Sequence, residues 1–282
     1  APCGLVAPIG PGVPKAEAKI GGGVLVHHYW GCSVCGHCRG GGSQRCSRQT
    51  PTVYGMTGHG AHAPYMKIPA RTLVSLPDEL SFETGAAIAC GTGTAYGALR
   101  RINISGNDTI AIFGQGPVGL SATQLAVAMG ARVIALDISP ERLARSREFG
   151  AAAVIDPASD DAVKAIRDLT HGLGADLSLD SSSAPSARLA AVQCVRTWGT
   201  ACFVGEGGHV TIDVSQDMLR RQVSVVGSWT FSTIGQAACA RFVADHKIAV
   251  DHLFTDRWRL DQATEAYKLF DQQNTGKGVF LM

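Results

Sequence analysis

Residues 109–119 read TIAIFGQGPVG, where an apolar run leads directly into a glycine-rich turn. The run Thr109–Phe113 predicts a buried strand, and the pattern over Val118–Met129 predicts a helix. Strand and helix patterns alternate from there to residue 204, with short connections. This alternation predicts an α/β domain built on a doubly wound parallel sheet of the Rossmann type. The further strands are expected at Arg132–Leu136, Ala153–Ile155, Ala175–Asp180 and Thr200–Val204, and the further helices at Pro140–Phe149, Asp161–Leu169 and Ser186–Val195.

The turn itself, Gly114-Gln115-Gly116-Pro117-Val118-Gly119, has the spacing of a dinucleotide-binding loop. In that motif Gly114 permits the tight turn, Gly116 lets the backbone approach a pyrophosphate, and Gly119 lets the helix pack on the strand. The amides at the start of the helix, around Pro117 and Val118, then face the phosphates. A glycine turn that serves packing alone is the alternative.

Asp137 ends the next expected strand, 18 residues after Gly119. A carboxylate at this place can accept hydrogen bonds from a ribose 2′-hydroxyl and repels a 2′-phosphate. The neighbouring residue, Ile138, is apolar and offers no charge to a 2′-phosphate. The sequence therefore favours NAD over NADP.

Four cysteines lie close together in the first hundred residues, Cys32, Cys35, Cys38 and Cys46. Thiolates at such spacings can converge on one structural zinc ion and close a small lobe, residues 32–46. A [4Fe–4S] cluster is the alternative, although the ferredoxin pattern places proline after its last cysteine and Ser47 stands here. Around the lobe, short runs such as Val24–Val26 and Tyr65–Ile68 predict an irregular β domain.

The last fifty residues predict two amphipathic helices and a terminal strand. The helices are expected near Gln236–Ala244 and Asp261–Leu269, and the strand at Gly278–Met282.

Composition narrows the class of protein. The 282 residues suggest two domains, and the net charge is only +2, with no basic block for nucleic acid or an anionic membrane. No secretory signal and no apolar run of membrane-spanning length is visible, so we expect a cytoplasmic protein. The nine cysteines fit metal binding in a reducing compartment. Three of them, Cys194, Cys202 and Cys239, are expected in the core.

The two motifs, in this order, resemble those of the zinc-containing alcohol dehydrogenases of the medium-chain dehydrogenase/reductase superfamily. The resemblance extends from Gly4 to Val279, and it identifies the four-cysteine lobe with the structural-zinc lobe of that family. It implies that Cys90 is a ligand of the catalytic zinc. For the cofactor it implies contacts from Thr94 at the nicotinamide, Val204 and Gly205 beside it, Arg142 at the adenosine ribose and Lys277 at the pyrophosphate.

The sequence also differs from the family at its N-terminal end. The first zinc-ligand cysteine and the Gly-His-Glu motif of the family would precede Ala1, so the family's N-terminal segment is missing from this sequence. The catalytic zinc site is then expected to be incomplete, or rebuilt from Cys90 with His28 or His59. A zinc-free site in which a histidine donates the proton is a second possibility, and solvated or packed histidines are a third.

The resemblance implies an incomplete GroES-like β domain, residues 1–91 and 229–282, and a Rossmann NAD-binding domain, residues 92–228. The implied activity is NAD(H)-dependent interconversion of a small alcohol with an aldehyde or ketone. Two alternatives remain open: a zinc-independent enzyme similar to quinone reductases, and a non-catalytic NAD-binding protein. Strand edges opened by the missing segment would need covering, so a homo-oligomer is expected, with a dimer first.

Overall fold

The computed structural model describes residues 2–272 and 276–282, so Ala1 lies outside the described residues. The chain divides into two compact units. The first unit holds residues 1–93 and 230–282, and the second holds residues 94–229.

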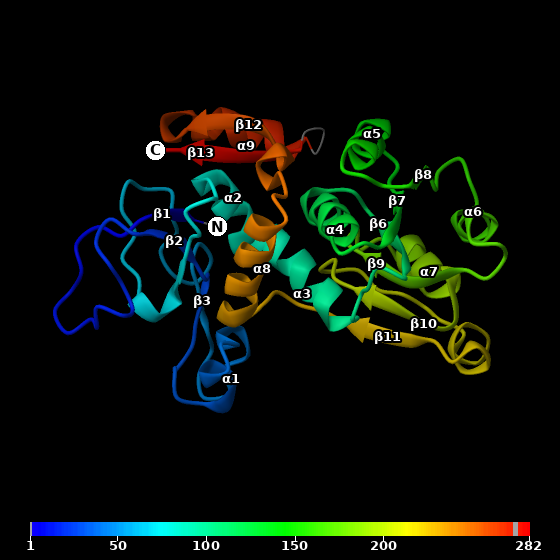
Figure 1. Ribbon diagram of the computed structural model, residues 1–282, viewed down its shortest axis with the longest axis horizontal. Coiled ribbons are helices and arrows are strands. Elements are labelled where there is room, and N and C mark those ends of the chain that lie inside the picture. The colour runs from blue at the N-terminus through cyan, green and yellow to red at the C-terminus, as the bar shows by residue number, and fades with distance from the viewer. Residues whose placement is uncertain (1, 273–275) are drawn as a thin grey trace. The chain divides into compact units, whose positions relative to one another are not determined.

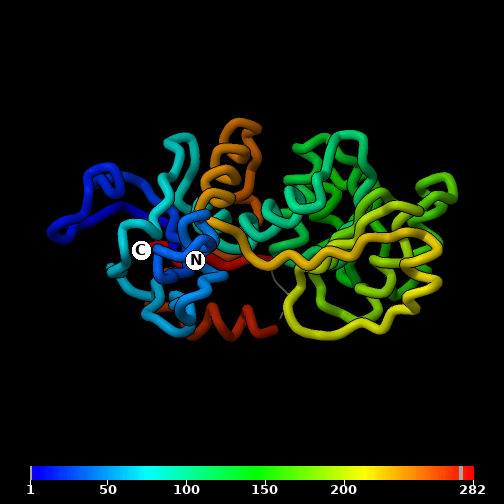
Figure 2. Tube along the Cα trace, turned by 90° about the horizontal axis from the view of Figure 1, so that it is seen from below, coloured from blue at the N-terminus to red at the C-terminus, as the bar shows by residue number. Residues whose placement is uncertain are grey.

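The second unit is built on one parallel sheet of six strands (Figure 1). Its strands are β6 (Thr109–Phe113), β7 (Arg132–Leu136), β8 (Ala153–Ile155), β9 (Ala175–Asp180), β10 (Val195–Phe203) and β11 (Ser224–Gly227). Their order is β11-β10-β9-β6-β7-β8, and every neighbouring pair is parallel. Figure 2 shows β10 and β11 running side by side along one edge. The chain order reverses between β6 and β9, which is where open α/β sheets form their ligand crevice.

Helix α3 (Gly93–Arg101) precedes the sheet, and four helices connect its strands: α4 (Pro117–Ala128), α5 (Pro140–Glu148), α6 (Ala162–Leu169) and α7 (Pro185–Cys194). Proline at the first turn starts α4, α5 and α7, and the side chains of Ser139 and Asp161 cap α5 and α6. Helix α4 packs on β6 and β7, whereas α7 packs on β9 and β10. The core between sheet and helices contains Phe113, Leu136 and Ile166, each at most 2% exposed.

The expected doubly wound sheet is confirmed. Strands β6 to β9 have the bounds expected from the sequence, and helices α4 to α7 begin and end within one residue of theirs. Strand β10 begins five residues early because Val195 already pairs with Ala175 of β9, and the register between the two strands shifts before Thr200. Helix α3 was not anticipated.

The first unit combines short strands with helices. An antiparallel sheet contains β1 (Cys3–Leu5), β2 (Gly23–Val26) and β5 (Leu73–Ser75); β3 (Tyr29–Trp30) pairs with β4 (Thr52–Val53), and β12 (Phe254–Arg259) pairs with β13 (Lys277–Leu281). The helices are α1 (Gly36–Arg39), α2 (Phe82–Ala87), α8 (Thr233–Asp245) and α9 (Ala263–Asp271). Both expected C-terminal helices and the terminal strand are present.

The strand expected at Tyr65–Ile68 is wrong. These residues form an irregular segment between Pro64 and Pro69, and Tyr65 is 79% exposed. Proline has no amide proton to donate to a neighbouring strand, so the two prolines disfavour pairing here.

Candidate functional site

The glycine-rich loop follows β6 and turns sharply into α4. Gly114 has φ +83°, and a Cβ there would lie 2.9 Å from Cβ of Ser182. At Gly119 a Cβ would lie only 1.8 Å from the Gly114 carbonyl oxygen, so α4 touches the loop backbone. At Gly116, by contrast, a Cβ would meet no atom within 4 Å. The loop is closed on its inner side and open at Gly116, which leaves room for a ligand to approach its backbone.

The start of α4 fits an anion. Gly116 is its N-cap and has no side chain to cap the helix, and Pro117 occupies the first turn. The N–H groups of the first turn, including that of Val118, face no side-chain acceptor from this cap, and the helix dipole adds positive potential. A pyrophosphate suits both features.

Asp137 follows β7 and is held by two backbone amides. Its Oδ2 accepts from the Gln115 N–H at 2.6 Å, and its Oδ1 accepts from the Ser139 N–H at 2.9 Å. Nη1 of Arg142 lies 3.8 Å from Oδ2. These contacts fix the orientation of the carboxylate at the end of its strand, where it can accept hydrogen bonds from a ribose.

Val204 and Gly205 follow β10, at the carboxyl ends of the parallel strands, as Asp137 does after β7. Both of their N–H groups donate to the Asp180 carbonyl, at 2.9 and 3.0 Å. Thr94 is half-buried in α3 of the same unit. Lys277 belongs to the other unit, where it begins β13 and places its Nζ 6.0 Å from the ring centroid of Phe254.

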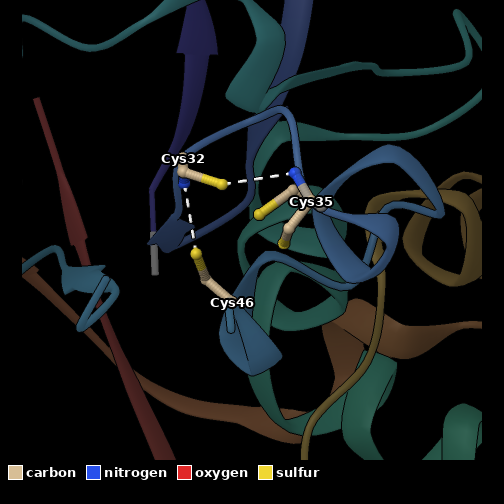
Figure 3. A group of neighbouring side chains, drawn as sticks. Cys32, Cys35 and Cys46 are labelled. Carbon is tan, nitrogen blue, oxygen red and sulfur yellow. Dashed lines mark hydrogen bonds between the residues drawn. The ribbon is translucent and has the colours of Figure 1, made fainter. Parts of the chain in front are cut away.

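The four cysteines of the lobe converge, as Figure 3 shows for Cys32, Cys35 and Cys46. The sulfur atoms of these three and of Cys38 all lie within 4.8 Å of one another. The Cys32 N–H donates to Sγ of Cys46 at 3.4 Å, and the Cys35 N–H donates to Sγ of Cys32 at 3.3 Å. Gly31 allows this convergence because a Cβ there would lie 2.6 Å from Sγ of Cys38.

The lobe is chemically suited to a metal. Backbone N–H donors lower the pKa of the Cys35 thiol to about 5 and also lower that of Cys46, whereas burial raises the pKa of Cys38 to about 12. A cation that displaces the thiol protons would offset the desolvation that disfavours the Cys38 thiolate. Four sulfur ligands with no open position fit a structural Zn²⁺.

Cys90 lies in a π-helical turn, Ile88–Thr92, between α2 and α3, and it is exposed. Nδ1 of His28 lies 3.1 Å from the carbonyl oxygen of Ala89, the residue before Cys90. Because a carbonyl only accepts, Nδ1 carries the proton, and Nε2 is the basic nitrogen. Burial lowers the pKa of His28 to about 4, which leaves the ring neutral at pH 7.

The structure does not gather Cys90, His28 and His59 into a three-ligand site. Within residues 2–272 and 276–282, only the four lobe cysteines bring three or more possible metal ligands together. His59 is exposed on the loop after β4.

Two contacts, one in each unit, were not anticipated from the sequence. His27 is fully buried and its Nδ1 lies 3.2 Å from Oε1 of Gln236, 209 residues along the chain. Ser181, which follows β9, donates to the carbonyl of Gly114 at 2.8 Å. Neither pairing has a local sequence signal, because each joins distant segments. The cysteines expected in the core, Cys194, Cys202 and Cys239, are all fully buried.

None of the helices in the described part of the chain is long and apolar enough to cross a membrane.

Comparisons with known proteins agree with this architecture. The family model for the alcohol dehydrogenase GroES-like domain matches residues 2–78, and that for zinc-binding dehydrogenases matches residues 117–245. The chain is 38% identical to the zinc-type alcohol dehydrogenase-like protein YphC of Escherichia coli, over 99% of this chain and 78% of that protein. It is 31% identical to L-threonine 3-dehydrogenase of Pyrococcus horikoshii, over 99% of this chain and 80% of that protein.

Among solved structures, the alcohol dehydrogenase TADH of Thermus sp. ATN1 superimposes with a TM-score of 0.89. It is 26% identical, and the match covers 99% of this chain and 82% of the Thermus chain. The chain is thus an oxidoreductase, and it belongs to the zinc-containing alcohol dehydrogenases of the medium-chain dehydrogenase/reductase superfamily.

Proposed function

We propose that this chain is an NAD(H)-dependent oxidoreductase that interconverts a small alcohol with an aldehyde or ketone. The observation that carries the proposal is the glycine loop, closed at Gly119 and open at Gly116, with the carboxylate of Asp137 fixed beside it. The names of its relatives, which include alcohol, L-threonine 3- and sorbitol dehydrogenases, support the substrate class.

Within this proposal, residues 92–228 form the NAD-binding domain, and residues 1–91 with 229–282 form the GroES-like domain. A bound nicotinamide dinucleotide would supply the hydride acceptor or donor. The α4 N-terminus, with Gly116, Pro117 and Val118, would bind the pyrophosphate, and Asp137 and Arg142 would bind the adenosine ribose. Thr94, Val204, Gly205 and Lys277 are assigned to the cofactor by the family resemblance.

We assign a structural Zn²⁺ to Cys32, Cys35, Cys38 and Cys46. In this role the metal would cross-link the lobe 32–46, whose α1 has only four residues and buries none of them.

The reacting groups are proposed to come from Cys90, His28 and His59. His28 is the best placed for proton transfer, because its ring is neutral and its basic Nε2 is not engaged by the Ala89 carbonyl. Cys90 lies on the same π-helical turn as Ala89. Its thiol could bind a metal ion or line the substrate site as a polar group.

A zinc-independent mechanism, similar to that of quinone reductases, is the second candidate. One observation favours it: among the described residues, the group of three or more possible metal ligands consists of Cys32, Cys35, Cys38 and Cys46 and does not include Cys90. A cofactor-binding protein without turnover is the remaining alternative.

Zinc content and NAD⁺ reduction, measured together on a panel of alcohols, distinguish these candidates. Two zinc ions per chain, with turnover lost in Cys90→Ala, support the alcohol dehydrogenase with a rebuilt metal site. One zinc with turnover intact in Cys90→Ala supports the zinc-independent enzyme. NADH binding without oxidation of any primary or secondary alcohol would leave only the non-catalytic role.

We also propose that the protein is cytoplasmic and forms a homo-oligomer, with a dimer as the first expectation. Strand β1 pairs with β2 alone and β13 with β12 alone among the described strands, so each keeps an edge that a second chain could cover. A monodisperse monomer in light scattering would contradict this proposal.

A further inference from the structure

The turn after β9 supports the glycine loop from the side opposite to Asp137. Ser181 continues the pairing of β9 with β6, since its N–H donates to the Phe113 carbonyl at 2.9 Å. Its hydroxyl oxygen lies 2.8 Å from the next carbonyl oxygen, that of Gly114, and 3.1 Å from that of Phe113, so the single hydroxyl proton favours the nearer Gly114 oxygen. The hydroxyl therefore contacts the first residue of the dinucleotide loop.

The Gly114 carbonyl and the Gln115 N–H belong to one peptide unit. A trans peptide is planar, and these two groups point in opposite directions. Ser181 donates to the carbonyl end, and Oδ2 of Asp137 accepts from the N–H end at 2.6 Å. The peptide between residues 114 and 115 is thus clamped between a side chain that follows β9 and a side chain that follows β7.

The turn that contains Ser181 is held by a buried ion pair between Asp180 and Arg188. The carboxylate of Asp180, which is fully buried, accepts from the N–H groups of Ser182 and Ser183 at 3.0 and 3.2 Å. Nε of Arg188 lies 3.4 Å from the same carboxylate, and its Nη2 donates to the Gly205 carbonyl at 2.6 Å. The turn that carries Ser181 is thereby tied to the ends of both β9 and β10.

We propose that Ser181 is a positioning residue for the cofactor: by fixing the peptide between Gly114 and Gln115, it orients Asp137 toward the ribose 2′-hydroxyl. This inference rests on the proposed NAD(H) function. Without the hydroxyl, one end of the peptide is released and it can rotate. The pyrophosphate site would then loosen for NADH and NADPH alike. Asp137 would also lose orientation, which weakens only the 2′-hydroxyl contact and relaxes repulsion of a 2′-phosphate.

The test compares Ser181→Ala with a matched control, Ser178→Ala. Ser178 lies on β9, three residues before Ser181, and it also donates to a backbone carbonyl, that of Ala191 at 2.7 Å, but on the α7 side. In fluorescence titrations Ser181→Ala should bind NADH about three- to tenfold more weakly than wild type, the equivalent of one lost hydrogen bond. Its affinity for NADPH should fall by a smaller factor, so the ratio of the NADPH dissociation constant to the NADH dissociation constant should decrease. Ser178→Ala should keep the wild-type preference.

A measurement without cofactor separates this inference from the proposed function. The Gln115 amide should exchange its hydrogen faster in Ser181→Ala than in wild type or Ser178→Ala, because the peptide that carries it is released. Faster exchange in a protein that binds no NADH would support the peptide clamp and refute the NAD(H) function. Unchanged exchange, unchanged NADH affinity, or equal losses for NADH and NADPH would each overturn the role of Ser181.

Discussion

Replacing Gly119 with alanine tests the geometry of the loop most directly. The new Cβ would lie 1.8 Å from the Gly114 carbonyl oxygen, 2.8 Å from the Gly114 carbonyl carbon and 2.9 Å from Oγ of Ser181. Ordinary contact begins at 3.4 Å, so α4 and the loop would have to separate by about 1.6 Å. Two of the three atoms are backbone, and they cannot rotate away as a side chain could.

The helix has little room to retreat. Leu120, Ala122, Leu125 and Ala126 of α4 are each at most 2% exposed, and close-packed interiors resist such shifts. Overpacking of this kind costs about 1–3 kcal/mol, and we expect the upper end here. At about 2–4 °C per kcal/mol, Tm should fall by about 6–12 °C.

Gly116→Ala is the control within the same loop. A Cβ there meets no atom within 4 Å, and the residue has φ −68°, which alanine adopts freely. Alanine is a poorer N-cap than glycine, but it also lowers the entropy of the unfolded chain, and these effects are of similar size, each about 0.5–1 kcal/mol. Tm should therefore stay close to wild type, whereas NADH affinity should fall at least about tenfold because the methyl group fills the approach to the backbone.

Two measurements on both variants test these expectations. Thermal unfolding followed by circular dichroism, without cofactor, gives Tm, and titration gives the NADH affinity. Close packing of α4 against the loop at Gly119 is refuted if Gly119→Ala unfolds at the wild-type temperature, or if Gly116→Ala loses as much stability as Gly119→Ala.

Three further predictions concern separate parts of the molecule. Cys46→Ser should bind one zinc fewer per chain and make residues 32–46 sensitive to limited proteolysis; a protease-resistant lobe without zinc would contradict the structural assignment. Burial, with a smaller contribution from the neighbouring His28, lowers the pKa of His27 from 6.5 to about 4. Between these two values the unfolded chain binds the proton more readily than the folded chain. The free energy of unfolding is therefore unaffected by His27 above pH 6.5, and it falls by about 1.4 kcal/mol per pH unit as the pH drops from 6.5 toward 4. Denaturant unfolding at several pH values should show a flatter profile for His27→Gln, and an unchanged slope would argue against a buried neutral ring. Asp137→Asn should weaken NADH binding and strengthen NADPH binding; equal changes for both would exclude Asp137 as the ribose ligand.

The sheet of the second unit could be predicted because its determinants are local. Runs such as Ile110–Phe113 are apolar throughout, as is typical of strands covered on both faces, and breakers mark their ends. In the first unit the same reasoning failed at Tyr65–Ile68, where a strand-like composition has no partner strand in the structure. Strand formation there depends on pairing between distant segments, and composition carries no information about that.

In the candidate site, too, the local features could be predicted from the sequence and the contacts between distant segments could not. The lobe cysteines lie within fifteen residues of one another, so the convergence of their sulfur atoms is a local property that their spacing can predict. Cys90 and His28 carry suitable chemistry, but the distance between such side chains is set by the tertiary fold, and no spacing rule predicts it. Ser181 is the clearest case: it belongs to a run of three serines that reads as a loop. Its contact with Gly114 exists because β9 and β7 flank β6 on opposite sides, so that one peptide after β6 lies within reach of side chains from both neighbours. Sheet order, and not any motif, determines which residues can hold the loop.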